Sequence, residues 1–166
     1  MSEISKKMIK DSYADCITNK YQFMYALKDE QIQALYTVLN KKHCLSVLPT
    51  GYGKSDIFVL APLLLDCLDK QKKHHSLVIV PLESLMLDMV CKFRDRSVSI
   101  VAIRQRKKMT KEEIMGIKNG QFSVILVSPE CLEEVVEWRD VIIGSDIYQQ
   151  NTCLIAIDEA HLLIQW

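Results

Sequence analysis

The chain has 166 residues, 49% hydrophobic and 25% charged, which is the balance of one compact globular domain. Its 21 basic residues cancel its 21 acidic residues, so net charge indicates no polyanionic partner and any nucleic-acid surface must be local. The six cysteines are widely spread and no leader or membrane span is evident. This pattern predicts reduced thiols in an intracellular protein, nuclear or cytoplasmic, without membrane association.

Short apolar runs alternate with longer helical patterns along the chain. The runs are nearly all apolar, as in strands that a parallel sheet buries on both faces. The predicted strands are Cys44–Leu48, Leu77–Val80, Val98–Ile103, Ser123–Val127 and Leu154–Ile157. After an N-terminal helix at about Glu3–Thr18, the predicted helices are Asp29–Asn40, Ser55–Lys70, Glu83–Phe93, Thr110–Lys118 and Glu130–Trp138. The alternation predicts an α/β fold, with ligands at the carboxyl ends of a mostly parallel sheet.

The first motif follows the first predicted strand. Residues 49–55 read Pro-Thr-Gly-Tyr-Gly-Lys-Ser, which contains the Gly-Lys-Ser core of a Walker A phosphate loop. Gly51 and Gly53 let the backbone turn its N–H groups toward phosphate oxygens, and Thr50 belongs to the same loop. Lys54 would reach the β- and γ-phosphates of ATP, and the Ser55 hydroxyl would ligate Mg²⁺.

The second motif follows the last predicted strand and reads Asp158-Glu159-Ala160-His161. The strand should deliver two carboxylates to the sheet edge where the phosphate loop ends. Asp158 suits a contact to Mg²⁺ through water, and Glu159 suits a general base that activates the attacking water. His161 would sense the γ-phosphate side. Alone, the motif could be a solvated helix start, but the phosphate loop supplies the other half of a two-part site.

From about Leu27 to Trp166 the chain resembles RecQ-like DNA helicases of superfamily 2. The phosphate loop, with Leu48 in place of the usual first glycine or alanine, and the Asp-Glu-Ala-His box carry this resemblance. It implies a RecA-like P-loop NTPase domain over residues 27–166, preceded by a helical lead-in over residues 1–26. The implied parent activity is ATP-dependent 3′-to-5′ unwinding of DNA at a junction of single strand and duplex.

The adenine side of the site is expected just upstream of the phosphate loop. Residues 27–31, Leu-Lys-Asp-Glu-Gln, resemble the Phe-Arg-Pro-Gly-Gln segment of the family. The resemblance implies that Gln31 hydrogen-bonds the adenine edge and that Lys28 takes the place of an arginine beside the base. The family's upstream aromatic residue aligns with Met24, which Phe23 and Tyr25 flank, and which of the three covers adenine is open. The alternative for Gln31 is an exposed helix residue.

Three further segments resemble DNA-contacting motifs of the family. Residues 77–88 resemble motif Ia, in which Ser84 and backbone amides would hold DNA phosphates. Residues 127–130, Val-Ser-Pro-Glu, resemble another strand-end contact, which would involve Ser128. Gln165 and Trp166 begin the loop that couples DNA binding to ATP hydrolysis, and they favour RecQ-like enzymes over DEAD-box RNA helicases.

A second RecA-like domain, which closes the ATP cleft and supplies an arginine, is missing from the 166 residues. We therefore expect weak Mg-ATP binding, slow hydrolysis and no unwinding by this chain alone. The alternatives are a catalytically silent P-loop scaffold, part of another superfamily 2 enzyme such as an RNA helicase or translocase, and a small-molecule P-loop kinase. A kinase is disfavoured because Glu159 would activate water.

Two basic stretches lie outside these motifs. One runs from Arg94 to Lys111, and the other comprises Lys70, Lys72, Lys73, His74 and His75. Either could contact nucleic-acid phosphates. The simpler interpretation is a pair of solvated loops, because no aromatic residues interleave with the charges as they do in base-stacking surfaces.

Overall fold

The computed structural model describes residues 3–49, 51–104, 109–134, 138, 141–142 and 144–160. Four parallel strands form its sheet, in the order β2-β3-β1-β4. The strands are β1 (His75–Ile79), β2 (Ile100–Ile103), β3 (Val124–Val127) and β4 (Thr152–Ile157). All four coincide with predicted strands, so the expected parallel α/β fold is confirmed.

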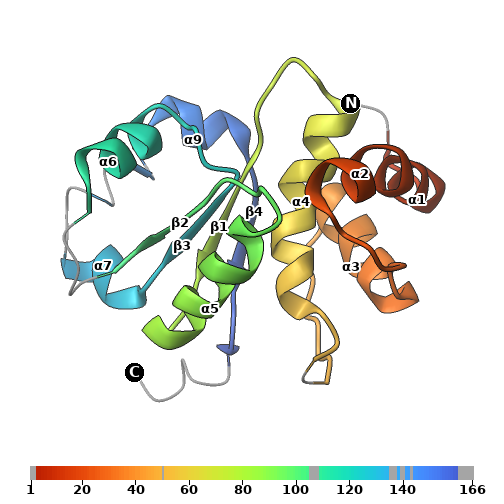
Figure 1. The fold of residues 1–166 in the computed structure, drawn as a ribbon, viewed down its shortest axis with the longest axis horizontal. Helices are drawn as coiled ribbons and strands as arrows, with labels where there is room; N and C mark the ends of the chain where they lie inside the picture. The colour runs from red at the N-terminus through yellow and green to blue at the C-terminus, as the bar shows by residue number, and fades with distance from the viewer. Residues whose placement is uncertain are drawn as a thin grey trace.

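Helices cover both faces of this sheet (Figure 1). Three short segments open the chain, followed by α3 and by α4, the helix after the phosphate loop. The bounds are α1 Lys6–Ser12, the π-helical η1 Tyr13–Ile17, α2 Thr18–Tyr21, α3 Asp29–Leu39, α4 Lys54–Leu68, α5 Glu83–Arg94, α6 Lys111–Lys118, α7 Pro129–Glu134 and α9 Asp146–Asn151. The sequence did not predict α9. The predicted end of α7, beyond residue 134, falls mostly outside the described residues.

Side chains that alternate along the strands enter two separate cores. Val78 and Val124 belong to the larger core, which they share with α1, α3, α4 and α5. Leu77 and Ile125 belong to the second core, with α6, α7 and α9. This two-sided burial explains why β1, β2 and β3 read as continuous apolar runs. The edge strand β4 differs, because its Ile155 and Ile157 are 66% and 45% exposed.

The predicted strand Cys44–Leu48 is wrong, because these residues pair with no strand in the described part of the chain. The segment lies on the surface instead, where the side chains of Leu45 and Val47 are 89% and 86% exposed. An apolar run is a local signal, whereas a strand also needs a neighbour that shares its backbone hydrogen bonds. The phosphate loop is therefore followed by its expected helix but is not preceded by a strand.

The predicted lead-in helix also differs from the structure. It is broken into α1, η1 and α2 and continues to Tyr21, after which Gln22 takes a left-handed backbone conformation with φ of 55°. The described residues contain no helix with the length and apolar character needed to cross a membrane.

The carboxyl ends of the strands form the edge that positions the candidate site. Asp158 directly follows β4, and its backbone N–H donates to the Ile79 carbonyl at the end of β1 at 2.9 Å. Ser128 follows β3 in the same way. The start of α4, the start of α5 and the end of β4 all lie at this edge, which is the lower one in Figure 1. The sheet thus gathers both predicted motifs at one edge.

Candidate nucleotide-binding site

The phosphate loop turns through two left-handed glycines. Gly51 has φ of 76° and Gly53 has φ of 83°, a region that other residues rarely adopt. Tyr52 closes the turn by donating its backbone N–H to the Pro49 carbonyl at 3.2 Å. Helix α4 then begins at Lys54, directly after the loop, and the Asp56 backbone N–H donates to the Gly53 carbonyl at 3.2 Å. A helix start offers backbone N–H groups and a positive dipole end that suit phosphate. Thr50 lies outside the described residues.

At position 53 both the surrounding side chains and the backbone conformation favour glycine. A Cβ atom there would lie 2.4 Å from Gln31 Nε2 and 2.9 Å from Asp56 Oδ2. At Gly51 a Cβ atom would meet nothing within 4 Å. The two side chains that crowd Gly53 therefore hold the loop close against α3 and α4, while Gly51 stays open toward solvent.

Gln31 is buried and links α3 to the phosphate loop, so the interpretation of an exposed helix residue is wrong. Its side chain is only 2% exposed. Its Nε2 donates to the Gly53 carbonyl at 3.1 Å, and its Oε1 accepts from the Lys28 backbone N–H at 2.9 Å. Both ends of the amide are thus used within the protein. The Lys28 ammonium lies 3.5 Å from the centre of the Tyr52 ring, a cation–π contact on the loop itself.

Asp56, in the first turn of α4, has a role that no sequence motif indicates. Its buried carboxylate accepts from the Tyr25 hydroxyl at 2.6 Å and from Lys92 Nζ at 2.9 Å. Burial is the main cause that raises the pKa of Tyr25 above its ordinary value, and the hydrogen bond to Asp56 raises it further. The contacts tie the segment before α3, the phosphate-loop helix and α5 together through one side chain.

The three candidates for the residue that covers adenine occupy different environments. Phe23 is fully buried and packs on Tyr13, Tyr25 and Phe93. Tyr25 is half-buried, with its hydroxyl on Asp56 and the Arg96 guanidinium 5.5 Å from its ring centre. Met24 is 84% exposed. Of the three side chains, Met24 alone is open to a ligand in this conformation.

The acidic box follows β4 at the sheet edge where α4 begins (Figure 1). Burial is the main cause that raises the pKa of Asp158 above its ordinary value, and the nearby charge of Glu159 raises it further. A hydrogen bond from the Glu159 backbone N–H and the charge of Lys54 act in the opposite direction. Glu159 sits in a left-handed turn with φ of 51°. The influence of Lys54 on Asp158 places these two groups within electrostatic reach, while His161 lies outside the described residues.

The residues predicted to contact DNA differ in how far their side chains are exposed. Ser84 is exposed in the first turn of α5. Ser128 is buried, 2% exposed, and its hydroxyl has no hydrogen-bond partner among the described residues. Gln165 and Trp166 lie outside the described residues. Among the predicted DNA contacts that the structure describes, Ser84 is the one with an exposed side chain.

The left-handed glycine loop, the helix that starts at its lysine and the facing carboxylates define a P-loop nucleotide-binding domain. The side chains fit a nucleotide with Mg²⁺, since Ser55 and Asp158 offer oxygen ligands at the loop. No group of three His, Cys, Asp or Glu side chains in the described ranges could hold a metal by itself. An Mg²⁺ ion would thus rely on phosphate oxygens and water for its remaining ligands.

Comparison with known proteins identifies the family. The model of the DEAD/DEAH box helicase family matches residues 28–166. The chain therefore belongs to the DEAD/DEAH box helicases, and it is a superfamily 2 helicase ATP-binding domain. Family membership implies ATP binding in general. The division between a lead-in at residues 1–26 and the main domain stays a prediction.

RecQ DNA helicases are distant homologues. The chain is 28% identical to the ATP-dependent DNA helicase RecQ of Bacillus subtilis over 148 residues, which cover 88% of the chain and 22% of that protein. It is 30% identical to the ATP-dependent DNA helicase Q-like 5 of Arabidopsis thaliana over 143 residues, which cover 85% of the chain and 14% of that protein. The chain thus spans about a fifth or less of these relatives.

A solved structure supports the fold. The helicase MrfA, crystallised with DNA and AMPPNP, superimposes with a TM-score of 0.64 at 17% identity. The match covers 97% of this chain and 22% of the MrfA chain. At this identity the likeness shows the RecA-like fold alone.

Proposed function

We propose that the chain is the ATP-binding half of a RecQ-type DNA helicase that unwinds DNA in the 3′-to-5′ direction. The observation that supports this proposal most is that α4 begins and β4 ends at the same edge of the sheet, so the phosphate loop and the acidic box lie at one edge (Figure 1). The charge of Lys54 also acts on Asp158. The RecQ type rests on relatives at 28–30% identity and on the motifs around Ser84, Gln165 and Trp166.

In the proposed reaction, the backbone N–H groups of residues 50–55 and the Lys54 ammonium hold the phosphates of ATP. Ser55 and Asp158 hold Mg²⁺, which neutralises charge on the phosphates when it is bound. Glu159 accepts a proton from a water molecule that attacks the γ-phosphorus, and the bond to the β–γ bridging oxygen breaks. The products are ADP and inorganic phosphate. His161 connects the γ-phosphate to the remainder of the enzyme.

The adenine base belongs on the side of Gln31 and Lys28. The two bonds that the Gln31 amide makes within the protein fix its orientation, and they leave its second N–H and the second lone pair of Oε1 to bind the adenine edge. Met24 is the candidate to cover the ring.

DNA is proposed to cross the same sheet edge at the start of α5, with Ser84 and the free N–H groups of that helix on phosphates. Ser128 acts there only if its buried hydroxyl becomes accessible. Unwinding needs the second RecA-like domain, which completes the ATP cleft and supplies an arginine.

The DNA assignment is tested with oligonucleotides of one sequence and length, made as DNA and as RNA. We expect single-stranded DNA to bind more tightly than RNA and to stimulate the slow ATP hydrolysis of the chain more strongly. A Ser84→Asp variant places a carboxylate at the proposed phosphate contact and should weaken DNA binding about tenfold, while Ser84→Asn should retain it. Stronger binding and stimulation by RNA would instead identify an RNA helicase.

Mg-ATP binding should be lost on acidification at a higher pH than an ordinary aspartate would predict. Asp158 must be ionised to hold the metal, and burial together with Glu159 raises its pKa above 3.8. Affinity is therefore full above the raised pKa and falls as the pH drops through it. The pH profile of nucleotide affinity should contain this step, and the profile of Asp158→Asn should lack it. In Asp158→Asn the nucleotide itself still titrates, so only the step that belongs to Asp158 should disappear. Identical pH profiles for the variant and the unaltered chain would contradict the assignment of Asp158 to the metal.

A further inference from the structure

A basic pocket lies at the opposite edge of the sheet from the phosphate loop. Its volume is about 440 Å³, and its walls come from α2, the end of α4, the loop before β1 and the segments that lead into β2 and β3. Figure 1 shows this loop and α2 at the amino-terminal edge of the sheet, at the top of the view. The pocket shares no residue with the candidate nucleotide site.

Positive charge dominates the lining of this pocket. Four lysines line it, Lys20, Lys70, Lys72 and Lys73, against a single carboxylate, Asp66. One oxygen of Asp66 already accepts from the His74 backbone N–H at 2.7 Å and lies 3.0 Å from His74 Nδ1. The carboxylate is thus oriented toward a histidine and compensates the lysines only in part.

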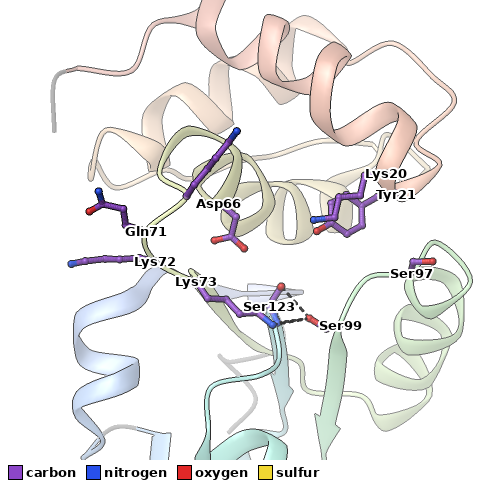
Figure 2. Close-up of a pocket in the computed structure, with 10 residues that line it drawn as sticks. Lys20, Tyr21, Asp66, Gln71, Lys72, Lys73, Ser97, Ser99 and Ser123 are labelled. Carbon is purple, nitrogen blue, oxygen red and sulfur yellow. Dashed lines mark hydrogen bonds between the residues drawn. The ribbon is translucent and has the colours of Figure 1, made fainter.

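Lys73 is held in place at the base of the pocket. Its ammonium donates to the Gln121 carbonyl and lies 3.5 Å from Ser99 Oγ, and Figure 2 shows it directed at Ser99 and Ser123. Lysine has three donors, and the described residues accept two of them, so one is left for a ligand. Desolvation is the main cause that lowers the pKa of Lys73, and the positive charge of Lys20 lowers it further.

Hydroxyl groups complete the lining. Ser99 Oγ lies 3.1 Å from Ser123 Oγ and accepts the Ser123 backbone N–H at 3.0 Å, which fixes both serines beside Lys73. Ser97, at the rim, is exposed and has φ of 60°. Lysine ammonium groups together with serine hydroxyls are donors that suit phosphate oxygens.

We propose that this pocket binds phosphate groups, supplied either by the backbone of a nucleic-acid strand or by a free nucleotide. Lys20 and Lys73 provide the charge, and Ser99 and Ser123 provide the polar floor. A bound phosphate would pair with the ammonium groups of both lysines, because the lysines that line the pocket outnumber its single carboxylate, Asp66. The site would let the domain hold a polyanion at the edge away from ATP hydrolysis.

Residue-resolved NMR of the whole ¹⁵N-labelled chain tests the proposal. The protein is titrated separately with inorganic pyrophosphate and with a short oligothymidylate. We expect the amide signals of residues 97–99 and 121–123 to shift. A response to both probes identifies nucleic acid as a possible source of the phosphate, and a response to pyrophosphate alone identifies a free nucleotide. Signals of Gly51 and Gly53 report the phosphate loop independently in the same spectra.

Matched variants distinguish specific binding in this pocket from non-specific electrostatic attraction to surface lysines. Lys20→Gln/Lys73→Gln should weaken binding at residues 97–99 about tenfold, while Lys7→Gln/Lys10→Gln, which removes the same charge from exposed positions of α1, should not. If loss of Lys73 unfolds the chain, a second pair of variants is compared. Ser97→Asp adds a negative charge at the rim of the pocket, and its control Ser97→Asn adds none, while neither change removes an internal contact. The proposal is overturned if neither probe shifts residues 97–99 and 121–123, or if the pocket variants bind like their controls.

Discussion

Replacing Gly53 by alanine is expected to lower the free energy of unfolding by about 2–4 kcal/mol, whereas the same change at Gly51 should cost about 1–2 kcal/mol. Both residues have left-handed backbone conformations, with φ of 83° and 76°, so both variants carry the conformational penalty. Only at Gly53 would the new methyl group collide with Gln31 and Asp56. The comparison isolates the cost of crowding from the cost of conformation.

The collision at Gly53 has functional consequences as well. To make room, the Gln31 amide must leave the Gly53 carbonyl, or Asp56 must shift away from Tyr25 and Lys92. Nucleotide binding should therefore weaken more in Gly53→Ala than in Gly51→Ala. Chemical denaturation and titration of a fluorescent ATP analogue measure the two effects. Equal losses in the two variants would mean that Gln31 and Asp56 do not support the loop.

Replacing Lys54 by alanine should weaken binding of Mg-ATP by about 10- to 100-fold, with little loss of stability. A charge-assisted hydrogen bond contributes about 1.5–3 kcal/mol, and each 1.4 kcal/mol is a factor of ten in affinity. Lys54 is half-buried at the start of α4, and alanine is a good helix former, so the helix should persist.

The matched control for this variant is Lys10→Ala, which removes the same charge from an exposed position of α1, far along the chain from the loop. Calorimetric titration with Mg-ATP would measure both affinities, and circular dichroism would check the folds. If Lys54→Ala and Lys10→Ala bind alike, the phosphate loop is not where the nucleotide binds.

The strands and several helix boundaries could be predicted because their signals are local. Apolar runs marked β1 to β4, and the Thr110–Glu113 spacing marked the start of α6, where both hydrogen bonds of the capping box form, at 3.1 and 3.0 Å. The acidic box was expected at the carboxyl edge of the sheet because it follows a predicted strand, and β4 does end there. The same reasoning fails for the phosphate loop, because the strand predicted before it is not formed.

Features that depend on distant partners could not be predicted. The run Cys44–Leu48 has the composition of a strand but pairs with no strand among the described residues. Helix α9 is short and carries two glutamines and an asparagine, so it shows no apolar periodicity. The Asp56 contacts join residues 31 and 36 positions apart, and nothing in the local sequence indicates them.

For two residues, the burial of the side chain differs from what the sequence predicted. Ser128 was predicted to contact DNA from the strand end, yet its hydroxyl is enclosed. His75 was grouped with a solvated basic stretch, but it is buried, and Nδ1 lies 2.7 Å from the Phe122 carbonyl. Desolvation is the main cause that lowers the pKa of His75 below its ordinary value. Sequence position places a residue at an edge but does not fix whether its side chain reaches solvent.

The central claim is that the phosphate loop and the acidic box form one Mg-ATP site. A double-mutant cycle of Lys54→Ala and Asp158→Asn, read by Mg-ATP affinity, tests it most directly. We predict that both single changes weaken binding and that the double variant loses less than their sum, because each residue acts on the same phosphates. Strict additivity, or an Asp158→Asn variant that binds Mg-ATP like the unaltered chain, would contradict the account.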